Sequence, residues 1–229
     1  MGIGICKIYL LAGLLAACLI GLGQSGVLAQ KLQREASLPP NADLGQVLSR
    51  KHNCWRCHGA FGVTDDSTRP NLAGQHAGYL EKQLFAFRDA ARHLPKGYPL
   101  ADRHHETMES VSRNLSDQDI KHLAAYYAGL TCHSSREAMR LPVPDMARRC
   151  FRCHGVEGRA KYPMLPRLAG QHAPYITKQL FALRQSQWTM EEEDPDRQRL
   201  HSMMKPQSEL LTDGDIYNLA AYFSHMRCR

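Results

Sequence analysis

Two short stretches with one shared pattern limit what this chain can fold into more than any other feature. Residues 54–58 read Cys-Trp-Arg-Cys-His, and residues 150–154 read Cys-Phe-Arg-Cys-His. The C-x-x-C-H pattern is the signature of covalent c-type haem attachment. Two thiols about one helical turn apart can reach the two vinyl groups on one edge of a porphyrin, and the adjoining histidine then faces the iron. Two copies of the pattern therefore predict two covalently bound haem c groups.

The pattern gives each of its residues a separate task. Each pair of thiols forms thioether bonds with a haem, and each histidine supplies the proximal imidazole ligand. A redox-active C-x-x-C pair or a structural zinc site is the alternative for paired cysteines. Two matches, both with a histidine next to the second cysteine, favour haem over these alternatives. The predicted attachment residues are Cys54, Cys57, Cys150 and Cys153, and the predicted proximal ligands are His58 and His154.

The chain is a tandem duplication in which the two copies are offset by 96 residues. Leu-Ala-Gly-Gln-His-Ala at residues 72–77 recurs at residues 168–173, and Leu-Ala-Ala-Tyr at residues 123–126 recurs at residues 219–222. A repeat that extends along most of the chain indicates two copies of one fold. The predicted organisation is a first domain at residues 41–132, a linker at 133–144 and a second domain at 145–229.

Hydrophobic periodicity predicts the helices of the first copy at residues 41–52, 77–92 and 116–127. The segment 59–70 is rich in glycine and short polar residues, so it is expected to be a loop. The second copy repeats this plan with one difference. Its leading segment, residues 144–149, leaves room for only about one to two helical turns before the cysteine motif.

The first 29 residues predict an export signal. Lys7 forms a positive n-region, residues 8–20 form an apolar h-region, and Val-Leu-Ala at residues 27–29 offers a cleavage site. The apolar core is shorter than the roughly 20 residues of a membrane span. Leu-Ala-Ala-Cys at residues 15–18 also resembles a bacterial lipobox, so lipidation at Cys18 stays open as an alternative to simple cleavage. Either route predicts an exported protein.

The charge of the chain argues against a nucleic-acid partner. The formal net charge is +7, but the basic residues do not form a run. Two haems would also bring four propionates and lower the net charge further. The mildly basic balance suits docking onto acidic redox proteins.

A haem iron that transfers electrons needs a sixth ligand opposite its histidine. Thioether sulfur favours a high potential because it stabilises the ferrous state. Met108 and Met204 follow His58 and His154 by 50 residues, and both lie in what we expect to be a non-helical approach to the last helix of each copy. Matched methionines behind matched haem motifs predict that Met108 and Met204 are the distal ligands.

Other side chains stay open as distal ligands. Met203 adjoins Met204, and methionines also serve as simple fillers of core gaps. Two pairs of histidines share the repeat offset and would give bis-histidine ligation instead. These histidine pairs are His105 with His201 and His76 with His172.

Two further cysteines, Cys132 and Cys228, are also related by the repeat offset. Each follows the last helix of its copy, and an oxidising compartment permits a disulfide between them. A disulfide that joins the two domains is therefore one hypothesis, and two free thiols or two thiol-based contacts are the alternatives that stay open.

Taken together, these motifs resemble those of the dihaem cytochromes c of the cytochrome c4 type. The resemblance covers about residues 41–229. Besides the cysteine motifs, it rests on Pro-x-Leu-Ala-Gly-Gln at residues 70–75 and 166–171, and on Leu-Ser-Asp-Gln-Asp-Ile at 115–120 with Leu-Thr-Asp-Gly-Asp-Ile at 211–216.

The resemblance implies an all-α fold of two tandem class I cytochrome c domains. It implies that Pro70 and Pro166 each offer a backbone carbonyl to the free ring N–H of the haem histidine, which would fix the imidazole orientation. It also implies a periplasmic protein, with peripheral membrane association in some members. Its expected partners are redox proteins, namely a respiratory complex, a dehydrogenase or a terminal oxidase.

Two functions fit these features. The first is an electron carrier in which both irons are six-coordinate and closed to substrate, so that the protein is not itself an enzyme. The second is a dihaem oxidoreductase, which would need an open or labile position at one iron. A methionine available to close each iron favours the carrier.

Overall fold

The computed structural model describes residues 39–91, 103, 105–132, 141–185, 199 and 201–228. The chain divides into two units, Met1–Pro39 and Pro40–Arg229, and the predicted haem residues all belong to the second. The predicted export signal at residues 1–29 and the part of the predicted linker at 133–140 lie outside the described residues. No helix in the described ranges is both long enough and apolar enough to cross a membrane.

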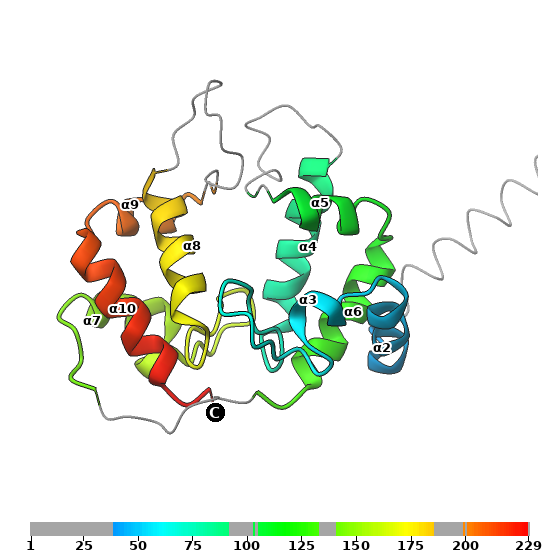
Figure 1. Cartoon of the computed structure of the whole chain (residues 1–229), viewed down its shortest axis with the longest axis horizontal. Coiled ribbons are helices and arrows are strands. Elements are labelled where there is room, and N and C mark those ends of the chain that lie inside the picture. The colour runs from blue at the N-terminus through cyan, green and yellow to red at the C-terminus, as the bar shows by residue number, and fades with distance from the viewer. Residues whose placement is uncertain are drawn as a thin grey trace, which may run out of the picture. The chain divides into compact units, whose positions relative to one another are not determined.

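The second unit is built from helices that occur in the same order in both copies (Figure 1). The long helices predicted in the first copy are confirmed, and each differs from its predicted bounds by one or two residues. The helices of the first copy are α2 (Ala42–Lys51), α3 (Trp55–His58), α4 (Ala77–Ala91), α5 (Glu106–Ser112) and α6 (Asp117–Gly129). The helices of the second copy are α7 (Ala147–His154), the 3-10 turn η1 (Val156–Gly158), α8 (Ala173–Gln185), α9 (Met204–Ser208) and α10 (Asp213–His225).

The last helix of each copy begins with a capping box. The side chain of Ser116 accepts a hydrogen bond from the backbone N–H of Asp119, and the carboxylate of Asp119 accepts from the backbone N–H of Ser116. Thr212 and Asp215 form the same reciprocal pair at the start of α10. Each box satisfies two backbone donors that a helix start leaves without a partner. The sequence therefore fixes where both terminal helices begin.

The two cores occupy the same positions in the two copies. Ile120 and Ile216 are fully buried, and Leu123 and Leu219 are nearly so. The apolar side of α6 packs against α4 and α2, and that of α10 packs against α8. The all-α fold with an internal duplication is confirmed.

Among the described residues, only the first copy has a helix of ten residues before its cysteine motif. Asn41 caps α2, and Gly45 lets that helix approach α6 so closely that its backbone lies against His122 and Tyr126. The hydroxyl groups of Ser49 and Tyr127 are 2.7 Å apart and join the two helices. The segment 141–146 contains no helix.

Phe151 partly replaces the missing helix in the second copy. Its ring lies 6.2 Å from that of Tyr222 and 6.3 Å from that of Phe223, so the attachment helix α7 itself contacts α10. In the second copy an aromatic cluster therefore lies where α2 packs against α6 in the first copy.

The prediction that both methionines lie in non-helical segments is wrong. Met108 lies inside α5, and Met204 is the first residue of α9. The reason is a cap that the sequence pattern did not reveal. The ring nitrogen of His105 accepts a hydrogen bond from the backbone N–H of Met108 at 3.4 Å, and His201 does the same for Met204 at 3.3 Å.

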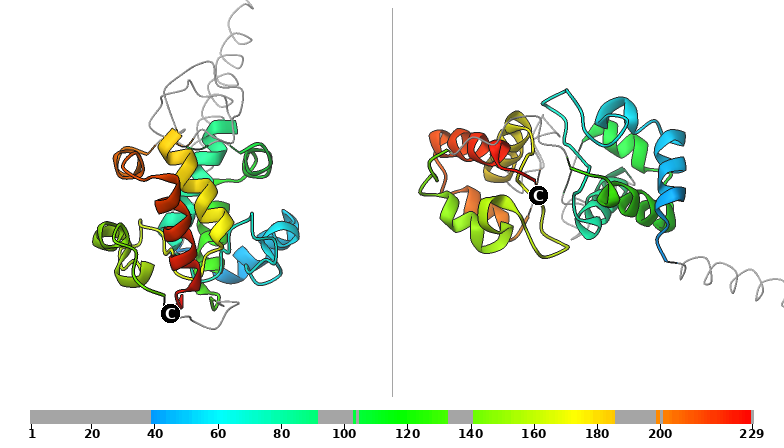
Figure 2. Two further views of the ribbon diagram at one scale, coloured as in Figure 1. Left: turned by 60° about the vertical axis from the view of Figure 1, so that its left-hand side comes forward. Right: turned by 90° about the horizontal axis from the view of Figure 1, so that it is seen from below.

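The two copies meet at a contact that we call the seam, formed by residues 71–76 and 167–172 together with Thr64 and Ala160. A ring nitrogen of His76 lies 2.8 Å from the carbonyl oxygen of Ala160, and that of His172 lies 2.9 Å from the carbonyl oxygen of Thr64. Each repeat thus reaches the backbone of the other. In Figure 2 the elements of the first copy and those of the second gather on opposite sides of this contact.

Candidate haem sites

Each cysteine motif lies on a helix whose last residue is the histidine. The thiols of both motifs are free in the structure rather than disulfide-bonded, and that of Cys153 is exposed. Burial raises the pKa of the Cys54 and Cys150 thiols above the ordinary value.

The haem histidines are buried, and each is held by one ring nitrogen. Nδ1 of His58 lies 3.0 Å from the carbonyl oxygen of Pro70, and Nδ1 of His154 lies 2.9 Å from that of Pro166. A carbonyl can only accept, so Nδ1 carries the proton and donates it. Burial lowers the pKa of both imidazoles, which keeps them neutral. Nε2 of each ring therefore keeps a lone pair for a metal.

The two methionines predicted as distal ligands are less exposed than Met203. Met108 and Met204 are half-buried, whereas the side chain of Met203 is 59% exposed. His105, three residues before Met108, is one of the groups that lower the pKa of His58, after burial and Arg69. In the second copy His154 is one of the groups that lower the pKa of His201, for which burial is the main cause.

The four histidines considered as alternative ligands all have other contacts. Burial, with Lys82 and Arg199, lowers the pKa of His201 to about 4, so the ring is neutral at pH 7 and its Nδ1 can accept the capping bond. His105 makes the equivalent capping bond. His76 and His172 extend across the seam to backbone carbonyls. These contacts favour structural roles for the four side chains.

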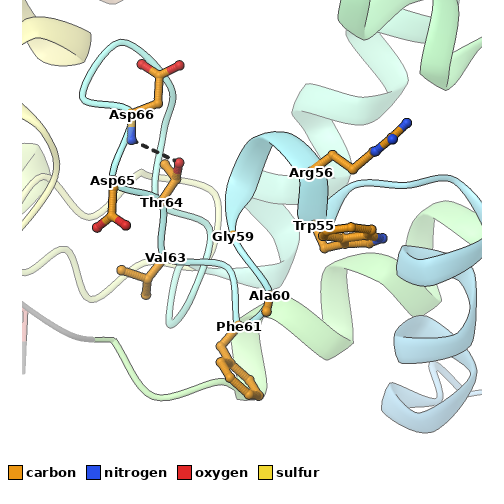
Figure 3. Close-up of a pocket in the computed structure, with 9 residues that line it drawn as sticks. All are labelled: Trp55, Arg56, Gly59, Ala60, Phe61, Val63, Thr64, Asp65 and Asp66. Carbon is orange, nitrogen blue, oxygen red and sulfur yellow. Dashed lines mark hydrogen bonds between the residues drawn. The ribbon is translucent and has the colours of Figure 1, made fainter.

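A pocket of about 550 Å³ lies beside the first cysteine motif (Figure 3). Trp55 and Arg56 line it from α3, and the loop from Gly59 to Asp66 lines it from the other side. The N–H of Asp66 donates to the hydroxyl of Thr64 at 3.2 Å and holds the turn of this loop. Neither the cysteines of the motif nor His58 line the pocket, so we do not assign the porphyrin to it.

The two remaining cysteines are joined in the structure. A disulfide connects Cys132 and Cys228, whose Cα atoms are 6.1 Å apart. The backbone of Gly74 lies against Cys132, and the backbone of Gly170 lies against Cys228. Both glycines have positive φ angles, 68° and 72°, so the repeated glycine of each Leu-Ala-Gly-Gln stretch combines a left-handed turn with room for a half-cystine.

The residues of each copy fit a covalently bound haem. In both copies two unpaired thiols precede a buried neutral imidazole whose outer nitrogen is tied to a backbone carbonyl. Among the residues that the structure describes, no cluster of three or more His, Cys, Asp or Glu side chains could hold a separate metal ion. The donor set in each copy is that of a haem protein.

A family model for cytochrome c matches residues 42–131 and again residues 146–227. The chain belongs to the cytochrome c family, as a two-haem member of the cytochrome c4 type. It therefore carries two covalently bound haem c groups and is an electron-transfer cytochrome. The duplication seen in the sequence is the pair of family domains.

Several known proteins are similar over nearly their whole length. Cytochrome c4 of Pseudomonas aeruginosa is 28% identical over 226 residues, which cover 91% of this chain and 96% of that protein. A thiosulfate dehydrogenase electron acceptor of Stutzerimonas stutzeri is 30% identical over 220 residues, or 94% of each chain. The crystal structure of reduced cytochrome c4 from Pseudomonas stutzeri matches with a TM-score of 0.64 and 27% identity, covering 82% of this chain and 100% of that one.

The sequence did not reveal the role of the glutamines in the Leu-Ala-Gly-Gln-His stretches. Gln75 and Gln171 are both buried, and each bonds to the backbone of the other copy. Their recurrence at the repeat offset could have indicated a role, because a polar residue present in both copies can make the same contact in each. Nothing in either copy alone shows that the contact lies on the other half.

Proposed function

We propose that the chain carries electrons between redox proteins in the periplasm, with a histidine and a methionine as the axial ligands of each haem iron. The supporting observation is the same in both copies. A neutral histidine is tied through Nδ1 to a backbone carbonyl, and a half-buried methionine follows it by 50 residues on a short helix. When bound, the haem iron supplies a reversible one-electron couple.

The protein's part in this function is to hold and close the iron site. Pro70 and Pro166 fix the imidazole tautomer and orientation, because each accepts the only ring proton of its histidine. The capping bonds to the backbone of Met108 and Met204 hold the first turns of α5 and α9 in place. A rigid ligand set changes little between the two redox states, which suits outer-sphere transfer.

A carrier must also bring one haem edge close to its partner. Cys153 is exposed, whereas Cys57 at the equivalent position is half-buried. The second attachment motif is therefore the more accessible of the two. The proposed location rests on the sequence, since residues 1–29 have the pattern of an export signal and haem attachment and disulfides both suit an exported protein.

Absorption spectroscopy of the purified two-haem protein tests the ligand assignment. We expect low-spin haems, the weak far-red band of methionine–iron ligation, and no binding of carbon monoxide by the reduced protein. Met108→Ala and Met204→Ala should each remove about half of the far-red band and open one iron to carbon monoxide. Met203→Ala is the matched control and should change neither property. Rapid carbon monoxide uptake by the unaltered protein would reject the carrier in favour of an oxidoreductase.

The similarity to a thiosulfate dehydrogenase electron acceptor suggests a class of electron donor. We propose that a periplasmic dehydrogenase of inorganic sulfur compounds reduces this chain. The oxidised protein should be reduced within seconds by such a dehydrogenase with thiosulfate, and should stay oxidised with thiosulfate alone. Reduction by thiosulfate alone would mean that the chain catalyses the oxidation itself.

A further inference from the structure

Two buried hydroxyl groups lie beside the first attachment cysteine. The backbone N–H of Cys54 donates to the carbonyl oxygen of Ser49 at 3.0 Å, which ties the start of the motif to the last turn of α2. The hydroxyl of Ser49 lies 2.7 Å from that of Tyr127 on α6, and both residues are buried. Cys54 packs against the core cluster that contains Tyr127. A serine, a cysteine and a tyrosine therefore meet inside the first domain.

Both hydroxyl groups reach the sulfur of Cys54. Burial raises the pKa of the Cys54 thiol, and hydrogen bonds from Tyr127 and, more weakly, from Ser49 act against that rise. Burial also raises the pKa of Tyr127 above its ordinary value, so the phenol keeps its proton and can donate it. We call Ser49, Cys54 and Tyr127 the hydroxyl triad.

The second copy has an equivalent ring without the hydroxyl. Phe223 is the counterpart of Tyr127 at the repeat offset. The ring of Tyr127 lies against Gly62, and that of Phe223 lies against Gly158, which is the counterpart of Gly62. The two rings therefore occupy the same place in their domains and differ by one hydroxyl group.

The sulfur of the second copy has a different environment. The counterpart of Ser49 is Asp145, which is exposed. The thiol of Cys150 donates to the carbonyl oxygen of Met146 at 3.6 Å. Burial raises the pKa of this thiol too, but no side-chain hydroxyl of the described residues acts on it. The hydroxyl triad is thus a feature of the first domain and has no equivalent in the second.

Haem attachment limits how the hydroxyl protons of the triad can point. The thiol adds across a vinyl group, so sulfur bonds to one vinyl carbon, the thiol proton passes to the other, and nothing is oxidised or reduced overall. A free thiol can donate or accept a hydrogen bond, whereas a thioether sulfur can only accept. The phenol is a more acidic hydroxyl than that of serine and hence the better donor to this weak acceptor.

We propose that Tyr127 is a positioning residue for the first haem, which donates its hydroxyl proton to the thioether sulfur of Cys54 while Ser49 donates to Tyr127 in turn. The bond orients the thioether link of the first haem and has no counterpart at the second. The proposal rests on haem attachment, and it depends neither on the redox partner nor on the sixth ligand.

The bond has a consequence for one of the two redox equilibria. A hydroxyl that donates to the thioether sulfur places the positive end of its dipole towards the haem, inside the protein where the field is weakly screened. This disfavours the ferric state, which carries one more positive charge than the ferrous state. Tyr127→Phe should therefore lower the equilibrium constant for reduction of the first haem about threefold, or about 28 mV at about 59 mV per tenfold change.

The second haem and a neighbouring tyrosine supply the controls. The equilibrium of the second haem should not change in Tyr127→Phe, which is expected to fold because phenylalanine already fills this place in the second copy. Tyr126→Phe should change neither haem. It removes a hydroxyl from the adjoining ring, 4.9 Å away, which is not among the described groups that bond to the Cys54 sulfur. Proton NMR distinguishes the haems through their contacts with Trp55 and Phe151.

Two results of this comparison would overturn the proposal. If Tyr127→Phe protein with both haems attached keeps the first equilibrium unchanged, the hydroxyl only joins α2 to α6. If both haems change equally, the substitution has loosened the fold and the effect is not a bond to one sulfur.

Proton NMR of the unaltered, fully reduced two-haem protein gives a test that requires no variant. The hydroxyl proton of Tyr127 should exchange slowly with water and show a nuclear Overhauser contact with the thioether protons of the first haem. A hydroxyl proton that contacts only the protons of Ser49, or that exchanges freely with water, would overturn the proposal. The far-red methionine band, read on the oxidised form of the same sample, reports separately on the proposed axial ligands.

Discussion

Gln75 forms two hydrogen bonds with the backbone of a single residue on the other half of the protein, Arg167. Its Nε2 donates to the carbonyl oxygen of Arg167 at 3.0 Å, and its Oε1 accepts from the backbone N–H of Arg167 at 2.9 Å. Gln171 forms the same pair of bonds with Asn71, both at 2.9 Å. The two haem domains are thus joined by a reciprocal pair of side-chain amides, each of which both donates and accepts.

Replacing these glutamines should loosen the seam. Gln75→Leu or Gln171→Leu removes two hydrogen bonds to the backbone of the other copy, at a cost of about 1–3 kcal/mol in the free energy of unfolding. Denaturant unfolding measures the cost, and hydrogen exchange at the amides of Arg167 and Asn71 locates it. Gln207→Leu is the control, because that exposed side chain bonds only to Arg149 of its own half among the described residues. Unchanged exchange at both amides would contradict the prediction.

The disulfide should contribute a large part of the stability, because it closes a loop of 96 residues. In the chain-entropy view, removing it with Cys132→Ser and Cys228→Ser lowers the free energy of unfolding by about 4 kcal/mol. Denaturation without reductant compares the double variant with the unaltered protein. Peptide mapping by mass spectrometry without reduction should show the two cysteines linked. Two alkylatable thiols in the native protein would show that the bridge does not form.

Gly45 tests the close approach of α2 and α6. A methyl group there would run into the carbonyl oxygen of His122 and come within 2.6 Å of Cβ of Tyr126. Gly45→Ala should therefore lower the free energy of unfolding by about 1–3 kcal/mol through overpacking. Gly129→Ala is the matched control, since no atom lies within 4 Å of its added methyl group, and it should be neutral or stabilising by up to about 1 kcal/mol. If both substitutions change the free energy of unfolding equally, helix propensity alone explains the change and overpacking at Gly45 does not.

The capping boxes should matter equally in the two domains. Ser116→Ala and Thr212→Ala each remove the acceptor for the N–H of the third helical residue, which costs about 1 kcal/mol. Chemical denaturation of both variants measures this loss. Ser224→Ala, near the end of α10, is the control because its hydroxyl bonds to a backbone carbonyl three residues earlier and caps no helix start. If Ser224→Ala loses as much stability as Ser116→Ala and Thr212→Ala, the capping boxes do not cause the loss.

The second capping box should also show in the titration of its acid. Hydrogen bonds from the hydroxyl and the backbone N–H of Thr212 hold the pKa of Asp215 below its ordinary value of 3.8. The stabilisation from this carboxylate is complete above pH 3.8 and is lost as the pH falls through the lowered pKa. Thr212→Ala should move the pKa back towards 3.8, as read from the side-chain carboxyl resonance of the reduced protein. An unchanged titration would mean that the bond does not persist in solution.

The sequence was enough to predict the features that repeat with a known local cause. The haem motifs, the start of α6 at Ser116 and the course of α4 all follow from residue spacing. The position of Met108 within a helix did not, because the cap is a histidine, a residue that rarely caps a helix. The β-bridge between Arg103 and Arg199 could not be predicted either, since Arg103 lies in a segment whose prolines and glycine indicate only irregular structure.

The seam contacts could not be predicted for a further physical reason. The side chains of Gln75 and His76 bond to backbone atoms of the other domain, and any residue can supply a backbone N–H or carbonyl. The receiving positions therefore carry no chemical signature in the sequence. Only the glutamine and histidine side chains are recognisable in the sequence. Neither side chain reveals which backbone group it binds.

Because the seam side chains bind backbone groups, the residues at the bound positions could differ between the two halves. The equivalent backbone positions hold different residues, Asn71 against Arg167 and Thr64 against Ala160. The backbone N–H groups of Asn71 and Arg167 nevertheless both donate at 2.9 Å, and the carbonyls of Thr64 and Ala160 lie 2.9 and 2.8 Å from the histidine rings. A hydrogen bond to a backbone group does not depend on the side chain of the residue that supplies that group. After the gene segment doubled, each copy was free to change the face that surrounds its own haem, and the pair still closed on itself in the original register.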